Sequence, residues 1–131
     1  SLKWDNNAPE RLYGNVNGCL AKGYHKVATP DGVWNFTEND FEDDALIFDR
    51  SQLHHVELLD KDNKPVVQLD FKAPAVGIWS PSGKHAPFVC IEPWYGIHDW
   101  AEFEGNFQEK YLMNQLLPGS SFMSEYIITI G

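Results

Sequence analysis

The sequence predicts an all-β protein in which antiparallel strands form a sandwich or a barrel. Apolar residues recur mostly at every second position or in short runs, and these segments are bounded by Gly, Pro, Asn and Asp. This spacing is typical of strands, whereas amphipathic helices repeat apolar residues every three to four positions. Strand-like segments also follow one another at about 8–12 residues without helices between them, which favours antiparallel sheets.

Two connections between strand-like segments have the composition of hairpin loops. Residues 60–65 read Asp-Lys-Asp-Asn-Lys-Pro, and residues 80–84 read Ser-Pro-Ser-Gly-Lys. Asp and Asn tolerate left-handed backbone conformations and bond their own backbone, so such stretches reverse the chain. The predicted strands are residues 44–49, 53–59, 66–71, 75–79, 88–92 and 125–130.

The remaining segments are less regular. Residues 107–115 have some helical character, but the stretch is short and ends before Pro118-Gly119, so irregular structure is favoured there. Residues 1–39 are expected to continue the same sheets, with short strands at 12–13 and 33–36 and turns at 15–18 and 29–32. We find no internal repeat, and 131 residues fit one domain with a core of ordinary size.

The charge balance argues against two classes of partner. The chain carries 10 Lys and Arg against 19 Asp and Glu, a net charge of −9. Such a chain repels phosphate backbones and anionic lipids, so we expect neither nucleic acid nor membrane partners. No apolar run reaches the roughly 18–20 residues that a membrane helix needs, which predicts a soluble protein. The two cysteines, Cys19 and Cys90, lie far apart and form no disulfide framework, so a reducing compartment, the cytoplasm, is expected.

The segment from residue 88 to residue 100 has the most unusual composition. An apolar strand delivers one carboxylate, Glu92, near its end, and Pro93 is expected to stop the strand because it lacks an amide proton. A carboxylate that leaves an apolar strand for an aromatic loop tends to have a raised pKa, which suits a general base. Aromatic faces beside a carboxylate also match the apolar C–H faces and the hydroxyls of a sugar. In the alternative interpretation, Glu92 caps a turn and the tryptophans belong to the core.

Other clusters carry weaker signals. His54 and His55 precede Glu57, but adjacent residues of a strand point to opposite faces, so no metal site is predicted. The acidic run at residues 38–44 lacks the spacing of a calcium loop, and only Asp43 or Asp44 is placed to point inward at a strand edge. The chain has no phosphate loop, no Ser or Cys nucleophile motif and no dinucleotide fingerprint, so no cofactor is predicted.

Four stretches, taken together and in order, resemble a known family. They are residues 41–48, 76–80, 88–96 and 116–122, and the specific element is Cys-Ile-Glu-Pro-Trp at residues 90–94. The sequence is similar to the aldose 1-epimerase (galactose mutarotase-like) family, in its divergent LacX-like branch. The resemblance implies an antiparallel β-sandwich of the galactose mutarotase-like supersandwich type. It covers nearly all of this chain but only the second half of the family's domain, so residues 1–131 are expected to be the C-terminal portion.

The resemblance also implies roles for individual residues. Glu92 matches the family's catalytic base at the end of a late strand. Asp44 matches a substrate-binding Asp at the start of an earlier strand, with Asp43 as the alternative if the alignment slips by one. Trp79 and Trp94 stand beside these motifs and are expected to line a sugar pocket.

One family element has no counterpart here. The family's catalytic acid is a His in a His-Pro-Tyr/Phe-Phe-Asn type motif, and the histidines of this chain lie in other contexts: His25, His54, His55, His85 and His98. The acid is therefore expected on an N-terminal half outside this chain, and the chain alone is expected to be inactive. We expect these residues to associate with that half or with a second copy.

The implied function is the interconversion of the α and β anomers of a free sugar without a cofactor. A base removes the proton of the C1 hydroxyl while an acid protonates the ring oxygen, and the opened ring closes again on either face. Two alternatives remain open from the sequence. One is a carbohydrate-binding or sugar-sensing protein that kept the fold without turnover. The other is a sugar-phosphate epimerase, which requires Arg or Lys at the pocket.

Overall fold

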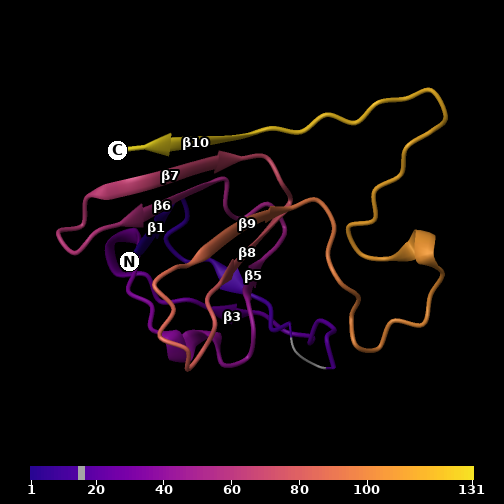
Figure 1. Ribbon diagram of the computed structural model, residues 1–131. Helices are drawn as coiled ribbons and strands as arrows, with labels where there is room; N and C mark the ends of the chain where they lie inside the picture. Colours follow the sequence, from indigo (N-terminus) through magenta and orange to yellow (C-terminus); the bar gives the residue numbers. More distant parts are fainter. Residues whose placement is uncertain (15–16) are drawn as a thin grey trace.

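A computed structural model describes residues 1–14 and 17–131, and it is almost entirely β-structure (Figure 1). Every ladder between named strands is antiparallel. The predicted all-β, antiparallel fold is therefore confirmed. Of the turn expected at residues 15–18, the first two residues lie outside the described part of the chain, and Asn17 and Gly18 have positive φ angles.

The larger sheet has five strands in the spatial order β10-β7-β6-β1-β4. Its strands are β1 (Leu2–Trp4), β4 (Val33–Trp34), β6 (His55–Leu59), β7 (Pro65–Phe71) and β10 (Tyr126–Ile130). The hairpin between β6 and β7 forms where residues 60–65 predict it, and Asn63 adopts a φ of 58° there. The sequence pattern missed β1, because three residues are too few to display an alternation.

The smaller sheet has three strands in the order β5-β8-β9. They are β5 (Leu46–Phe48), β8 (Ala75–Trp79) and β9 (Cys90–Trp94), and β8 has the predicted bounds. The expectation that Pro93 stops its strand is wrong, because Pro93 pairs with Val76 and β9 continues to Trp94. Since β9 is an edge strand, a residue without an amide proton is tolerated there.

The remaining elements are short, and two of them pair as a separate two-stranded sheet. They are β2 (Glu10–Arg11), β3 (His25–Lys26) and three 3₁₀ turns, η1 (Pro30–Gly32), η2 (Glu38–Phe41) and η3 (Phe107–Glu109). The η3 turn is all the helical structure in residues 107–115, as the composition favoured. No helix in the described residues is long and apolar enough to cross a membrane.

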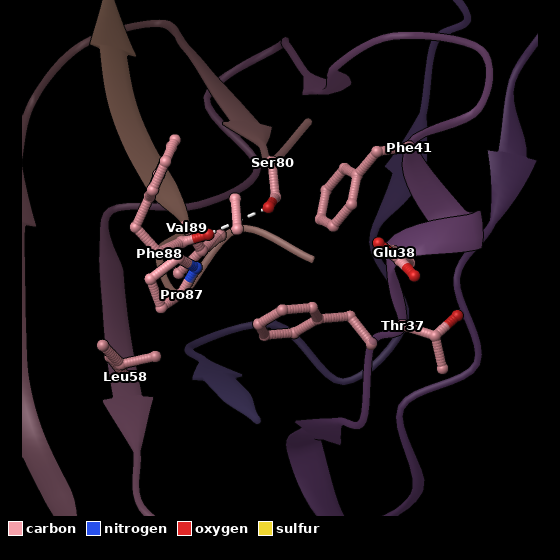
Figure 2. Close-up of a pocket in the computed structure, with 10 residues that line it drawn as sticks. Thr37, Glu38, Phe41, Leu58, Ser80, Pro87, Phe88 and Val89 are labelled. Carbon is pink, nitrogen blue, oxygen red and sulfur yellow. Dashed lines mark hydrogen bonds between the residues drawn. The ribbon is translucent and has the colours of Figure 1, made fainter. Parts of the chain in front are cut away.

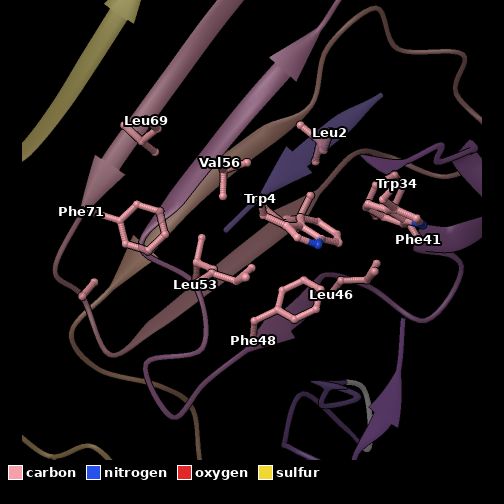
Figure 3. Close-up of a cluster of buried hydrophobic side chains, with 13 residues drawn as sticks. Leu2, Trp4, Trp34, Phe41, Leu46, Phe48, Leu53, Val56, Leu69 and Phe71 are labelled. Carbon is pink, nitrogen blue, oxygen red and sulfur yellow. The ribbon is translucent and has the colours of Figure 1, made fainter. Parts of the chain in front are cut away.

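The main core lies between the two sheets (Figure 3). Burial of each large apolar side chain contributes about 1.5–3 kcal/mol, so this interface dominates the stability of the fold. It uses one face of the small sheet, which presents the even-numbered residues of β5 and β8. The core residues are Leu2, Trp4, Trp34, Phe41, Leu46, Phe48, Leu53, Val56, Leu69, Phe71, Ala73, Val76 and Ile78.

The opposite face of the small sheet carries a second, smaller apolar cluster. Leu12, Leu20 and Ile47 are its buried members. The backbone amide of Leu12 donates to the carbonyl of Ile47 at 2.8 Å, which holds the segment before Gly14 against β5. This face, covered by N-terminal and C-terminal loops, is where the candidate site lies.

The C-terminal arm leaves the body of the protein after β9. It runs outward as a long loop and returns to add β10 beside β7 (Figure 1, orange to yellow). All five residues of β10 are exposed, including three isoleucines.

Candidate functional site

A cavity of about 380 Å³ opens on the outer face of the three-stranded sheet. This volume falls within the range of small-molecule sites. We call it the Glu92 cavity. The sheet, the loop after η2 and two loop residues supply its walls, which are Gly14, Asp44, Ala45, Ile47, Trp79, Glu92, Trp94 and His98. The structure thus brings together the four residues that the sequence singled out, namely Asp44, Trp79, Glu92 and Trp94.

The register of the small sheet explains this grouping. Ile47 pairs with Gly77, and Gly77 pairs with Glu92, so the three form one row across the sheet. Because side chains alternate between faces, Trp79 and Trp94, two residues away from this row on their strands, point to the same side. The residues that alternate with them, such as Ile78 on β8 and Ile91 on β9, face the main core. The pattern therefore assigns one face of the sheet to packing and the other to the cavity.

Glu92 is half-buried and faces the cavity rather than capping a turn. Its Oε2 accepts a hydrogen bond of 3.2 Å from Nε1 of Trp94, which lies two residues on along the same strand face. Cys90 precedes it on that face, where burial and the Glu92 carboxylate raise the pKa of the thiol. The thiol is therefore held in its protonated, poorly nucleophilic form. Glu92 is the carboxylate that β9 presents to the cavity.

The indole of Trp94 lies over Gly77 of the neighbouring strand. A Cβ at position 77 would lie 2.7 Å from Cη2 of Trp94, closer than real Cβ contacts come. The glycine therefore makes room for the ring to lie flat against the sheet, where it lines the cavity and donates to Glu92.

Asp44 reaches the cavity from the turn that follows η2. Its φ of 76° is a left-handed conformation that Asp tolerates better than most residues. Its amide donates to the carbonyl of Phe41 at 3.1 Å, and its Oδ1 accepts from the amide of Ala45 at 2.8 Å. Asp43 and Asp44 are both exposed, and of the two only Asp44 lines the cavity.

His98 is the cavity residue that sequence reasoning did not select. It lies in the loop after β9, four residues beyond Trp94, and its ring is 6.3 Å from the indole at an angle of 69°. Its closeness to Glu92 in the sequence was the available signal. That signal was weak, because a loop after a strand can turn in any direction.

The adjacent histidines His54 and His55 have separate partners. His55 bonds Asp70 through Nδ1 at 2.7 Å and Glu57 through Nε2 at 3.1 Å. His54 is exposed and packs against Phe71. Within the described residues no group of three or more His, Cys, Asp or Glu side chains is arranged to hold a metal ion.

A second cavity, of about 310 Å³, lies between η2 and the loop that joins β8 to β9 (Figure 2). Phe41 and Phe88 contribute to its mostly apolar wall, and Oγ of Ser80 donates to the carbonyl of Phe88 at 2.9 Å. Its one charged wall residue is Glu38, which pairs with His85 at 2.9 Å. No predicted site residue lines this cavity.

Comparison with known proteins supports the resemblance. No family model matches the chain. This chain is 34% identical to chromosomal Protein LacX of Lactococcus lactis subsp. lactis over 92 aligned residues. The aligned residues make up 69% of this chain and 30% of that protein. The plasmid-encoded Protein LacX of the same organism is 33% identical, and the alignment again covers 69% of this chain and 30% of that protein. The chain therefore spans about a third of the curated relatives it matches.

A solved structure is similar over almost the whole chain. A galactose mutarotase related enzyme from Lactobacillus acidophilus matches 99% of this chain with a TM-score of 0.82 and 30% sequence identity. The match covers 44% of that enzyme. The sheets described above therefore correspond to less than half of that enzyme's chain.

Proposed function

Because the chain belongs to the aldose 1-epimerase-like family, in its LacX branch, we propose that the Glu92 cavity binds a free sugar and that the protein interconverts the sugar's α and β anomers. One observation carries the proposal: Asp44, Glu92 and the two tryptophans line a single cavity. Tryptophan faces stack on the C–H faces of a sugar ring, and carboxylates accept bonds from its hydroxyls.

In this mechanism Glu92 removes the proton of the C1 hydroxyl. The hydrogen bond from Trp94 to Oε2 orients the carboxylate. As the ring C1–O bond breaks, the ring oxygen takes a proton from an acid, and rotation about C1–C2 followed by closure gives the other anomer. Proton transfer by one positioned group contributes about 10²–10⁴-fold to the rate. Asp44 hydrogen-bonds a sugar hydroxyl and orients the ring.

We propose that the acid comes from a part of the sandwich outside residues 1–131. The family's His-Pro-Tyr/Phe-Phe-Asn type motif does not occur in this sequence. The chain matches 44% of its structural relative, which leaves room for a further segment over the cavity. We also propose a cytoplasmic location, which the two free cysteines, Cys19 and Cys90, support.

The test is an anomerisation assay on the full-length natural protein. A freshly dissolved aldohexose anomer is followed by optical rotation, with Glu92→Gln beside the wild type and Glu104→Gln, an exposed residue, as control. We expect Glu92→Gln to slow mutarotation by at least about 10²-fold while sugar binding changes little. Unchanged turnover in that variant would refute the assignment of the base.

The same assay separates the alternative functions. Binding of sugar without any acceleration by the wild type would identify a carbohydrate-binding or sensing protein. A sugar-phosphate epimerase requires cations at the cavity, and neither Lys nor Arg is among the described residues that line it. Nothing in this site therefore favours the phosphorylated substrate.

A further inference from the structure

His98 has hydrogen-bonding capacity that the fold does not use. Its ring lines the Glu92 cavity, and its Nε2 is buried without a hydrogen-bond partner among residues 1–14 and 17–131. Buried polar side-chain atoms of native proteins almost always have a partner. A polar ligand in the cavity can therefore supply the hydrogen-bond partner that this imidazole nitrogen lacks.

The backbone around His98 is fixed on both sides. The carbonyl of Asp99 accepts from the amide of Leu20 at 2.7 Å, and the amide of Ala101 donates to the carbonyl of Leu20 at 2.9 Å. Ile97 packs into the smaller apolar cluster. The imidazole thus stands on an anchored segment, which lowers the entropy lost when it contacts a ligand.

Position 14, beside His98, is occupied by a glycine. A Cβ at Gly14 would lie 3.2 Å from Nε2 of His98 and 2.8 Å from Cδ1 of Ile47. Any larger residue at position 14 would crowd the imidazole and the Ile47 side chain, so the glycine keeps this side of the nitrogen free of a Cβ. On its other side the ring meets Trp94, whose Nε1 already donates to Glu92.

We infer that His98 is a further ligand-contacting residue of this site, whose Nε2 forms a hydrogen bond with a hydroxyl of the bound sugar. The inference rests on the proposed function, since it assigns a contact within the same cavity. Both polar groups lie near Trp94, which donates to Glu92 and whose ring centroid is 6.3 Å from that of His98. A ring-shaped polyol can stack on the indole and meet both.

The test is a calorimetric titration with an aldohexose of four proteins: wild type, His98→Phe, His98→Gln and the control His85→Phe. His85 is exposed and lies outside the cavity. We expect His98→Phe to weaken binding by about 3- to 10-fold, the scale of one hydrogen bond, and His98→Gln to recover part of the loss. The control should bind as the wild type does.

A second measurement needs no variant, in case His98→Phe fails to fold. Saturating sugar should shift the imidazole ¹⁵N resonances of His98 in the wild type while those of His85 stay in place. Unshifted His98 resonances, or binding by a folded His98→Phe equal to that of the wild type, would overturn the inference and leave the proposed function standing. A wild type that binds no aldose would overturn both.

Discussion

The hydroxyl of Tyr111, in the C-terminal arm, donates a 2.7 Å hydrogen bond to Oδ2 of the fully buried Asp49. The same oxygen accepts a 2.8 Å bond from the hydroxyl of Tyr24. Arg50 adds a cation at 3.6 Å from the other oxygen, and its guanidinium stacks on the Tyr24 ring. One carboxylate therefore joins the N-terminal loops, β5 and the arm.

We predict that Tyr111→Phe lowers the free energy of unfolding by about 1.5–3 kcal/mol, the range for a hydrogen bond to a charged group. The buried carboxylate would lose one of its two tyrosine donors. Urea denaturation measures the change, with Tyr126→Phe, in the exposed strand β10, as the matched control. If Tyr111→Phe unfolds at the same urea concentration as the wild type, the arm is not held by this contact.

The two tyrosines that bond Asp49, Tyr24 and Tyr111, predict a loss of stability at alkaline pH. Burial and the hydrogen bond to Asp49 raise the pKa of Tyr24 to about 12, and the same causes raise the pKa of Tyr111. Both hydroxyls stay protonated in the folded state at a pH where the unfolded chain ionises. Stability should therefore be complete below pH 10 and fall as the pH rises through the folded pKa. Equal melting temperatures at about pH 9 and 11 would contradict this.

His55 gives a second pH dependence, near neutrality. Burial alone would lower its pKa, but the hydrogen bonds with Asp70 and Glu57 outweigh burial, and the net effect is a raised pKa. This contribution to stability is fully present below the unfolded value of about 6.5 and is lost as the pH rises through the folded pKa. The urea midpoint should fall between about pH 5.5 and 8.5, and His55→Gln should flatten that slope. If the urea midpoint of His55→Gln depends on pH as steeply as that of the wild type, His55 is not the source of this pH dependence.

Gly77→Ala should damage the cavity without touching a polar group. The new methyl would collide with the Trp94 indole, so the ring must move and its bond to Glu92 is lost. We expect a shift in tryptophan fluorescence and at least about 10-fold weaker sugar binding, because stacking and orientation are lost together. Gly96→Ala is the control, since its Cβ would meet nothing closer than 3.9 Å. Equal sugar affinity for both variants would contradict the prediction.

The exposed face of β10 predicts association of this chain. Ile128 lines an apolar groove that also includes Ile91 and Leu69. Exposed apolar surface of this extent favours burial against a partner, either a further part of the sandwich or a second copy, through an interface above about 1,000 Å². In sedimentation, Ile128→Lys should reduce self-association of the 131-residue chain, and Thr129→Lys, on the other face of β10, should not. A wild-type monomer that melts cooperatively and binds no apolar dye would refute this.

The sequence predicts most of the sheet pattern, because alternation and turn chemistry are local properties. The bounds of β8 and the hairpin before β7 follow from them directly. Glu92 was singled out from composition, and Asp43 or Asp44 from its place at a strand edge, before the family resemblance gave Glu92 and Asp44 their roles. The register explains why Trp79, Glu92 and Trp94 share one face of the sheet. His98 and the buried Asp49 were not predicted, because each depends on a loop packing against residues about 60 to 85 positions away.

The walls of the Glu92 cavity join segments that are distant along the chain. Leu12 bonds the backbone of Ile47, and Leu20 bonds that of Asp99. Closing such long loops costs entropy before any contact is gained, so we expect these pairings to form late in folding. The β6–β7 hairpin can form early and locally, whereas the cavity exists only once both ends of the chain have docked. Sugar binding during refolding would therefore report the final step of assembly and would trail the appearance of β-structure.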